Sequence, residues 1–264
     1  MILFDAWIFG ITLVGGAVLF ASLGVLLVRK RVATGRLKGH HEVAGYLLSI
    51  VGTLYSVLLG LVVVDTQAKY QEAKMMTQKE ADACLDLFHL AYTTPMVTRH
   101  RLHKALQEYL RIVVEDEYDS VLKLGTFDES AKQPFREIWW TLCDYEPQTG
   151  KEQSAYQKIL DVMEEFTDGR RYRLQIIKQG LPLVTWGVLI AGGILTVFFT
   201  YMFEVENVKA QVLMTSLVVL ALSLNLLLIA LFNNPYRGHM RIQSYAFKYD
   251  LNVTKELLTA RPDD

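Results

Sequence analysis

The stretch from Val43 to Gln67, VAGYLLSIVGTLYSVLLGLVVVDTQ, limits what this chain can fold into more than any other part of it. Its first 22 residues, as far as Val64, carry no charge. At a rise of about 1.5 Å per residue, an α-helix of that length crosses a hydrocarbon core about 30 Å thick. We therefore expect a transmembrane helix here.

Small residues recur along this predicted span at helical spacing. Steps of four, three, four and four residues separate Gly45, Ser49, Gly52, Ser56 and Gly60. Small side chains on one helix face let a second backbone approach closely in lipid, where burial of apolar surface gives little drive for association. The stripe therefore predicts a helix-packing face, either against other helices of the same subunit or against copies of itself around a pore.

Hydrophobic residues make up 52% of the chain and are concentrated in four blocks, whereas most charges lie between the second and third blocks. This distribution predicts an all-α membrane protein of four transmembrane helices, with a helical soluble insert between the second and third. The three further predicted spans are residues 6–28, 181–203 and 210–232.

Composition divides the chain into four segments. Residues 1–67 hold the first two spans and a basic loop, 68–179 the insert, 180–233 the last two spans, and 234–264 an amphipathic tail. We expect the tail to pack on the insert. Its predicted buried side consists of Ile242, Tyr245, Ala246, Tyr249 and Val253.

The insert shows amphipathic helical periodicity and no strand pattern. The second span is expected to continue as one long helix to Thr94, because Pro95 disfavours helical geometry in the residue before it. Further helices are predicted over about 97–122, 132–143 and 152–179. Their buried faces include Leu102, Leu106, Tyr109, Leu110, Val113, Ile138, Leu142, Ile159, Met163 and Phe166.

Several classes of function are disfavoured. A net charge of −1 argues against a nucleic-acid partner. No nucleophile motif, phosphate-binding glycine loop or set of metal ligands is evident, so we expect no enzyme activity, no cofactor and no metal site. His100 and His103 lie three residues apart, yet no carboxylate or cysteine at matching spacing accompanies them. The acidic run Glu115 to Glu117 is typical of a solvated helix face.

Four isolated polar residues have ordinary structural interpretations. Cys84 and Cys143 are interpreted as buried small residues rather than a disulfide. Asp65, at the end of the second span, is expected to cap or to lie at the interface, and an ion path is the alternative. For Asn225, within the fourth span, a hydrogen bond to another helix is expected.

Residues 51–64, VGTLYSVLLGLVVV, and 69–76, KYQEAKMM, form a recognisable pattern: two glycines flank an apolar stretch, and an aromatic residue and Glu-Ala-Lys follow. This pattern resembles the pore helix of bestrophin channels. Asn234, Pro235 and Gly238 belong to a run, NPYRG, that resembles the Asp-Pro-Phe-Gly turn after the last bestrophin span. Over nearly its whole length, the chain is similar to the bestrophin-like domain family of bacterial membrane proteins.

The resemblance implies a homopentameric ion channel whose second spans surround a central pore. By position, the neck of that pore would be lined by Thr53, Val57 and Leu61. An apolar constriction can gate by dewetting, so no charged filter is required. The expected partners are membrane lipids, permeant ions and further copies of the chain. The alternative is a non-conducting membrane scaffold or regulatory protein with the same fold, which the apolar Val62, Val63 and Val64 after the neck favour.

Basic residues give conflicting indications of orientation. The basic loop over residues 29–38 predicts a cytoplasmic position for itself, which would place the insert and both termini outside. The resemblance favours the opposite arrangement, with the insert and both termini in the cytoplasm and the spans in a bacterial plasma membrane. That arrangement also agrees with the basic residues that flank the third and fourth spans: Arg170, Arg171, Arg173, Lys178, Arg237 and Arg241.

Overall fold

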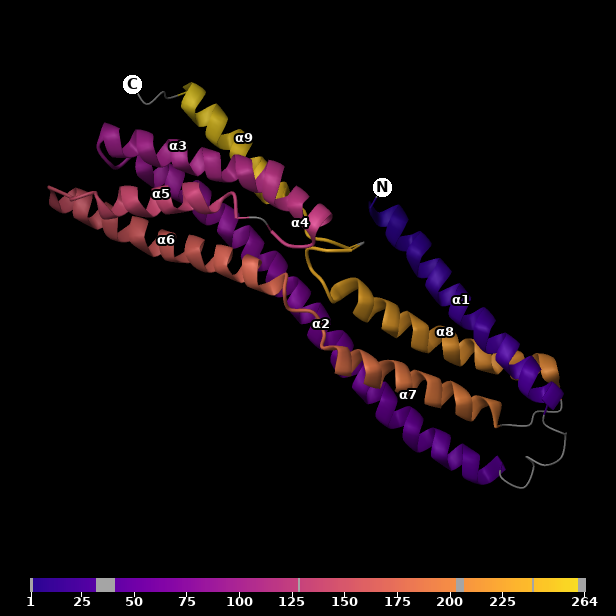
Figure 1. Ribbon diagram of the computed structural model, residues 1–264. Helices are drawn as coiled ribbons and strands as arrows, with labels where there is room; N and C mark the ends of the chain where they lie inside the picture. Colours follow the sequence, from indigo (N-terminus) through magenta and orange to yellow (C-terminus); the bar gives the residue numbers. More distant parts are fainter. Residues whose placement is uncertain (1, 32–40, 128, 203–206, 239, 261–264) are drawn as a thin grey trace. The chain divides into compact units, whose positions relative to one another are not determined.

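The computed structural model describes residues 2–31, 41–127, 129–202, 207–238 and 240–260, and most of the predicted basic loop lies outside them. Helices joined by short turns make up the described residues, which contain no strand (Figure 1). The all-α prediction is confirmed. Two compact units are present, Met1–Tyr70 with Gly180–Asn234, and Gln71–Gln179 with Pro235–Asp264.

The first unit contains four helices that are long and apolar enough to cross a membrane, as predicted. Helices α1 and α8 lie side by side, and α7 packs on both (Figure 1). Hydrogen bonds join them, for example Ser22 Oγ to Ser216 Oγ at 3.1 Å. The bounds are α1 Ile2–Arg31, α2 His41–Ala91, α7 Leu183–Tyr201 and α8 Val208–Phe232.

Local signals set where the last two spans begin. Pro182 precedes the first residue of α7 with an extended ψ of 145°, and proline fixes φ without needing a donor there. Asn207 caps α8, because its side-chain oxygen accepts a hydrogen bond from the Lys209 amide at 2.9 Å. These caps place the helix starts two residues from the predicted block edges.

The second unit is a helical bundle formed, in its described residues, by the part of α2 from Gln71 to Ala91 and six shorter elements. The helix predicted over residues 97–122 runs without interruption from Met96 to Leu124, and a π-helical turn, η2, lies within it. The remaining predicted bounds lie within a few residues of the observed ones. The elements are α3 Met96–Ile112, η2 Val113–Glu117, α4 Tyr118–Leu124, α5 Lys132–Cys143, α6 Gly150–Ile176 and α9 Tyr245–Ala260.

The C-terminal helix α9 packs on α3. The predicted buried side of the tail is confirmed only in part: Ile242 is buried and Ala246 packs against the core, but Tyr245 and Tyr249 are 70% and 67% exposed. The buried face follows spacings of three, one and three residues instead. It consists of Phe247, Asp250, Leu251 and Thr254.

Candidate functional site

The predicted neck residues share an open face of α2. Val57 and Leu61 are 57% and 66% exposed within the single chain. Thr53 is exposed as well, and its hydroxyl donates to the Ser49 carbonyl at 2.7 Å, so it presents mainly its methyl group outward. No other helix of the described chain covers this face.

The small-residue stripe lies beside the neck residues and is also open. Ser49, Ser56 and Gly60 are exposed, and Gly45 and Gly52 are partly exposed. A methyl group added at Gly52 or Gly60 would meet no other atom within 4 Å. The stripe therefore does not serve packing between α2 and the other spans of its own subunit.

The opposite face of α2 packs within the membrane unit. Tyr55 and Leu59 are buried with Leu189 of α7 and Ile229 of α8. Val62 and Val63 are partly buried against the same cluster, whereas Val64 is 65% exposed. The helix therefore has one side directed toward α7 and α8 and one side left free.

Two other predicted polar positions make only local bonds. Asp65 is exposed and pairs with Lys69 one turn later, at 2.7 Å. Asn225 donates to the Ala221 carbonyl of its own helix at 2.9 Å, so the predicted bond between helices is wrong. The side-chain amide of Asn225 can donate to this carbonyl one turn back, because each α-helical carbonyl oxygen has a second lone pair.

The segment after α8 is held by side-chain and backbone bonds. Asn233 accepts from the Leu181 amide at 2.6 Å, and Asn234 is partly buried beside it. Pro235 is buried and its carbonyl accepts from the Ile242 amide at 2.7 Å. Gly238 adopts a φ of 83°, which favours glycine.

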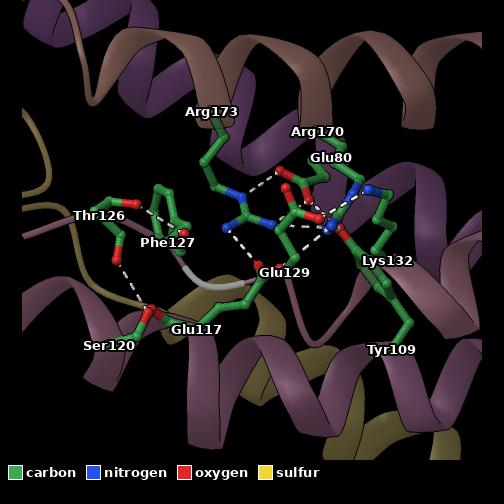
Figure 2. Close-up of polar contacts among 10 residues, drawn as sticks. All are labelled: Glu80, Tyr109, Glu117, Ser120, Thr126, Phe127, Glu129, Lys132, Arg170 and Arg173. Carbon is green, nitrogen blue, oxygen red and sulfur yellow. Dashed lines mark hydrogen bonds and ion pairs between the residues drawn. The ribbon is translucent and has the colours of Figure 1, made fainter. Parts of the chain in front are cut away.

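A buried ionic network occupies the second unit (Figure 2). Arg173 of α6, fully buried, donates two bonds to Glu80 of α2, at 2.7 and 2.8 Å. Its third nitrogen lies 2.8 Å from a carboxylate oxygen of Glu117, which is also fully buried. One guanidinium therefore bridges α2, η2 and α6 through two carboxylates.

Two further residues complete this network. Arg170 donates to the Tyr109 hydroxyl at 2.9 Å and lies 3.3 Å from Glu117. The Tyr109 hydroxyl in turn donates to Glu80. Two arginines and two glutamates balance one another, so the cluster is neutral when all four are ionised.

Electrostatics keep Arg173 charged. Burial alone lowers the pKa of Arg173, but the charges of Glu80 and Glu117 outweigh that effect and hold its pKa well above the usual value. The pKa of Tyr109 is raised well above its usual value by burial and by Glu80. The tyrosine therefore stays a hydrogen-bond donor. Proton transfer is not supported by such an arrangement, which is instead suited to holding helices in register.

Sequence reasoning missed this network and assigned Glu117 to a solvated face. That assignment is wrong for Glu117, although Glu115 and Asp116 are exposed. A signal was present in the spacing. The buried positions of α6 continue in steps of three and four residues onto charged side chains: Ile159, Met163, Phe166, Arg170 and Arg173.

Other candidate ligands do not converge. No group of three or more histidine, cysteine or acidic side chains in the described ranges could hold a metal ion. His103 is buried and stacks on Phe88 at a ring separation of 3.9 Å. Cys84 is buried as predicted, but Cys143 is exposed, and both thiols are free.

Comparison with known proteins gives one family and several similar solved structures, two of which follow. The family described as Bestrophin-like domain matches residues 15–247. A point variant of a membrane protein shares a TM-score of 0.67 and 11% identity, over 93% of this chain and 97% of that one. A mutant bestrophin homologue from Klebsiella pneumoniae is similar with a TM-score of 0.64 and 12% sequence identity. The match covers 94% of this chain and 99% of that one. No curated protein matches.

Proposed function

Because this chain belongs to the bestrophin-like domain family, we propose that it is an oligomeric ion channel of a bacterial plasma membrane. In this proposal five copies surround an axis lined by α2. Thr53, Val57 and Leu61 form an apolar neck. The second unit, which is the soluble unit, and both termini lie in the cytoplasm. Permeant ions and lipids are the ligands.

The observation that carries the proposal is the open face of α2. Gly52 and Gly60 have no neighbour within 4 Å of an added methyl group, although the opposite side of the helix is buried. A stripe of small residues in lipid lets another helix approach closely, and no helix among the described residues packs on it. Copies of α2 around an axis would use it.

The apolar character of the proposed neck is compatible with conduction. Rings of aliphatic side chains can expel water and close a pore, and wetting of the same ring opens it. Shortening such side chains is therefore expected to widen the constriction and to raise ion flux. Neither a charged filter nor a cofactor enters this proposal.

The test combines subunit counting with flux. Single-particle imaging of the nanodisc-embedded protein is expected to show a ring of five copies with α2 on the axis. In liposomes, Val57→Ala and Leu61→Ala are each expected to raise flux. Leu217→Ala on α8, whose side chain is 56% exposed, is the matched control and should conduct as the parent does. A monomer, or unchanged flux in both neck variants, would overturn the channel proposal.

A non-conducting scaffold is the second candidate. The apolar Val62, Val63 and Val64 after the neck favour it, because no charged side chain between Gly45 and Val64 could act as an ion filter. The same imaging experiment with no flux from an intact ring would support this candidate.

A further inference from the structure

The ring of Tyr55 lies against two adjacent glycines of α7. A Cβ built on Gly192 would come within 2.5 Å of two ring carbons, and one on Gly193 within 3.1 Å of the hydroxyl oxygen. Real Cβ atoms essentially never come within 3.0 Å of another group, so the ring excludes a side chain at Gly192, and the 3.1 Å at Gly193 is tighter than nine in ten real contacts. The ring therefore fills the space that the absence of side chains at these two positions leaves open.

A hydrogen bond of the Tyr55 hydroxyl fixes the orientation of the ring. It donates to the Leu189 carbonyl, one turn before Gly193. Tyr55 is only 5% exposed, and a phenol at bilayer depth needs an acceptor because no bulk water is available. The ring is thus fixed both in its depth between the helices and in the way it points.

Helical geometry connects Tyr55 to the open face of α2. Thr53 and Val57 precede and follow Tyr55 by two residues. At 3.6 residues per turn, a step of two residues turns the chain by about 200°, to the far side of the helix. Both are exposed, whereas Tyr55 is buried. Any rotation of α2 that shifts the Tyr55 ring would turn the open face by the same angle.

We infer that Tyr55 is a positioning residue. Its ring, seated over Gly192 and Gly193, sets the rotation of α2 about its own axis and hence the residues that α2 presents away from α7. Only the description of those residues as a pore neck rests on the proposed function. The rotational role of Tyr55 holds whether or not the protein conducts.

The test uses the full chain in nanodiscs with a nitroxide label on Val57→Cys. Cys143→Ser removes the exposed native thiol, and Cys84 is buried. The line width of the label's electron paramagnetic resonance spectrum reports how freely the label moves. It does so in water, in lipid and against another copy of the chain. Gly192→Ala displaces the ring and is expected to shift this line width. Gly187→Ala is the matched control on the same helix, since an added methyl group there meets nothing within 4 Å.

Removing the ring separates a specific contact from a general disturbance. In a Tyr55→Ala background, Gly192→Ala is expected to cause no further shift, because the atoms it would strike are gone. A spectrum of Gly192→Ala that matches Gly187→Ala would overturn the inference. So would a Gly192→Ala shift that persists at full size without the ring.

Tyr55→Phe keeps the ring and removes the bond to Leu189. It is expected to give a smaller shift in line width than Gly192→Ala. If Gly192→Ala yields no folded protein, Tyr55→Phe becomes the test of the inference. In that case a Tyr55→Phe spectrum identical to the parent would overturn the inference. Flux and subunit number are measured separately. If the parent protein passes no ions but the spectra change as expected, the channel proposal fails and the role of Tyr55 stands.

Discussion

Arg173 lies at 0% exposure between the carboxylates of Glu80 and Glu117. Arg173→Met keeps a long side chain but leaves those two negative charges buried with only Arg170 nearby. Removing one partner of a buried ion pair typically costs about 3 to 5 kcal/mol. We expect a loss of that size in the free energy of unfolding, measured by denaturant titration of the soluble unit's helical signal.

Arg171→Met is the matched control for this variant. Arg171 lies on the same helix, and its ion pair with Asp168 is 63% and 54% exposed. Exposed pairs contribute little because water and salt screen them. Equal destabilisation by the two substitutions would contradict the role assigned to the buried network.

Asp250 is 3% exposed, and one of its carboxylate oxygens has no partner in the described structure. Burial, with the charges of Asp82 and Asp86, raises its pKa to about 6. Because this folded-state pKa lies above the usual value of 3.8, the protonated acid favours folding. The stabilisation is complete below about pH 4 and is lost as pH rises through about 6.

Asp250→Asn should remove this pH dependence. The amide stays neutral, so at pH 8 we expect the variant to be more stable than the parent by about 2 kcal/mol, less than the full shift because Asp82 and Asp86 are exposed to screening salt. At pH 4 the two proteins should unfold alike. Unfolding titrations at both pH values test this, and a constant difference between them would exclude titration of Asp250 as the cause.

Sequence alone could identify single residues only where their environment follows from type and spacing. Leu102, Leu106 and Tyr109 are buried as the helical period predicts. Glu117 was missed because an acidic run is usually solvated and its arginine partners lie far along the chain, on α6. The Tyr55 contact was missed for a related reason: the glycines that receive its ring belong to another span, 137 and 138 positions later in the chain.

At the scale of whole helices, α6 approaches α2 closely at Gly169. A Cβ there would lie 2.8 Å from the Cβ of Glu80 and 3.0 Å from its Cα. Backbone atoms of a packed helix cannot yield as a flexible side chain does, so Gly169→Ala must push the helices apart. We expect a destabilisation of about 1 to 3 kcal/mol in thermal or denaturant unfolding.

Gly150→Ala provides the comparison for this variant. Gly150 is the first residue of α6, and an added methyl group there meets nothing within 4 Å. Alanine has the higher helix propensity, so this variant should be neutral or slightly more stable. If Gly169→Ala were equally harmless, the two helices would not pack as described.

The four spans were predictable because length and apolar character are sufficient to recognise a helix that crosses a membrane. Two features of the second unit could not be predicted from the sequence. The π-helical turn Val113–Glu117 accommodates an extra residue per turn and leaves no mark in composition. The buried face of α9 includes Asp250, whose charge interrupts the apolar pattern on which the prediction of that face depended.

For the molecule as a whole, exposed apolar side chains on the spans are expected from lipid contact alone. Leu183, Phe198 and Leu217 are all more than half exposed and need no protein partner. The open face of α2 differs from these surfaces because it combines the small-residue stripe with apolar neck residues. This difference supports assembly of copies through α2 rather than through α7 or α8.

Orientation is the remaining property of the whole molecule, and Cys143 can report it. Its thiol is exposed on the soluble unit, whereas Cys84 is buried. With the soluble unit in the cytoplasm, a membrane-impermeant maleimide should leave intact cells unlabelled and should label the protein after permeabilisation. Cys143→Ser should abolish labelling in both samples. Labelling of intact cells would instead place the soluble unit outside, as the basic residues that end α1 predict: Arg29, Lys30 and Arg31.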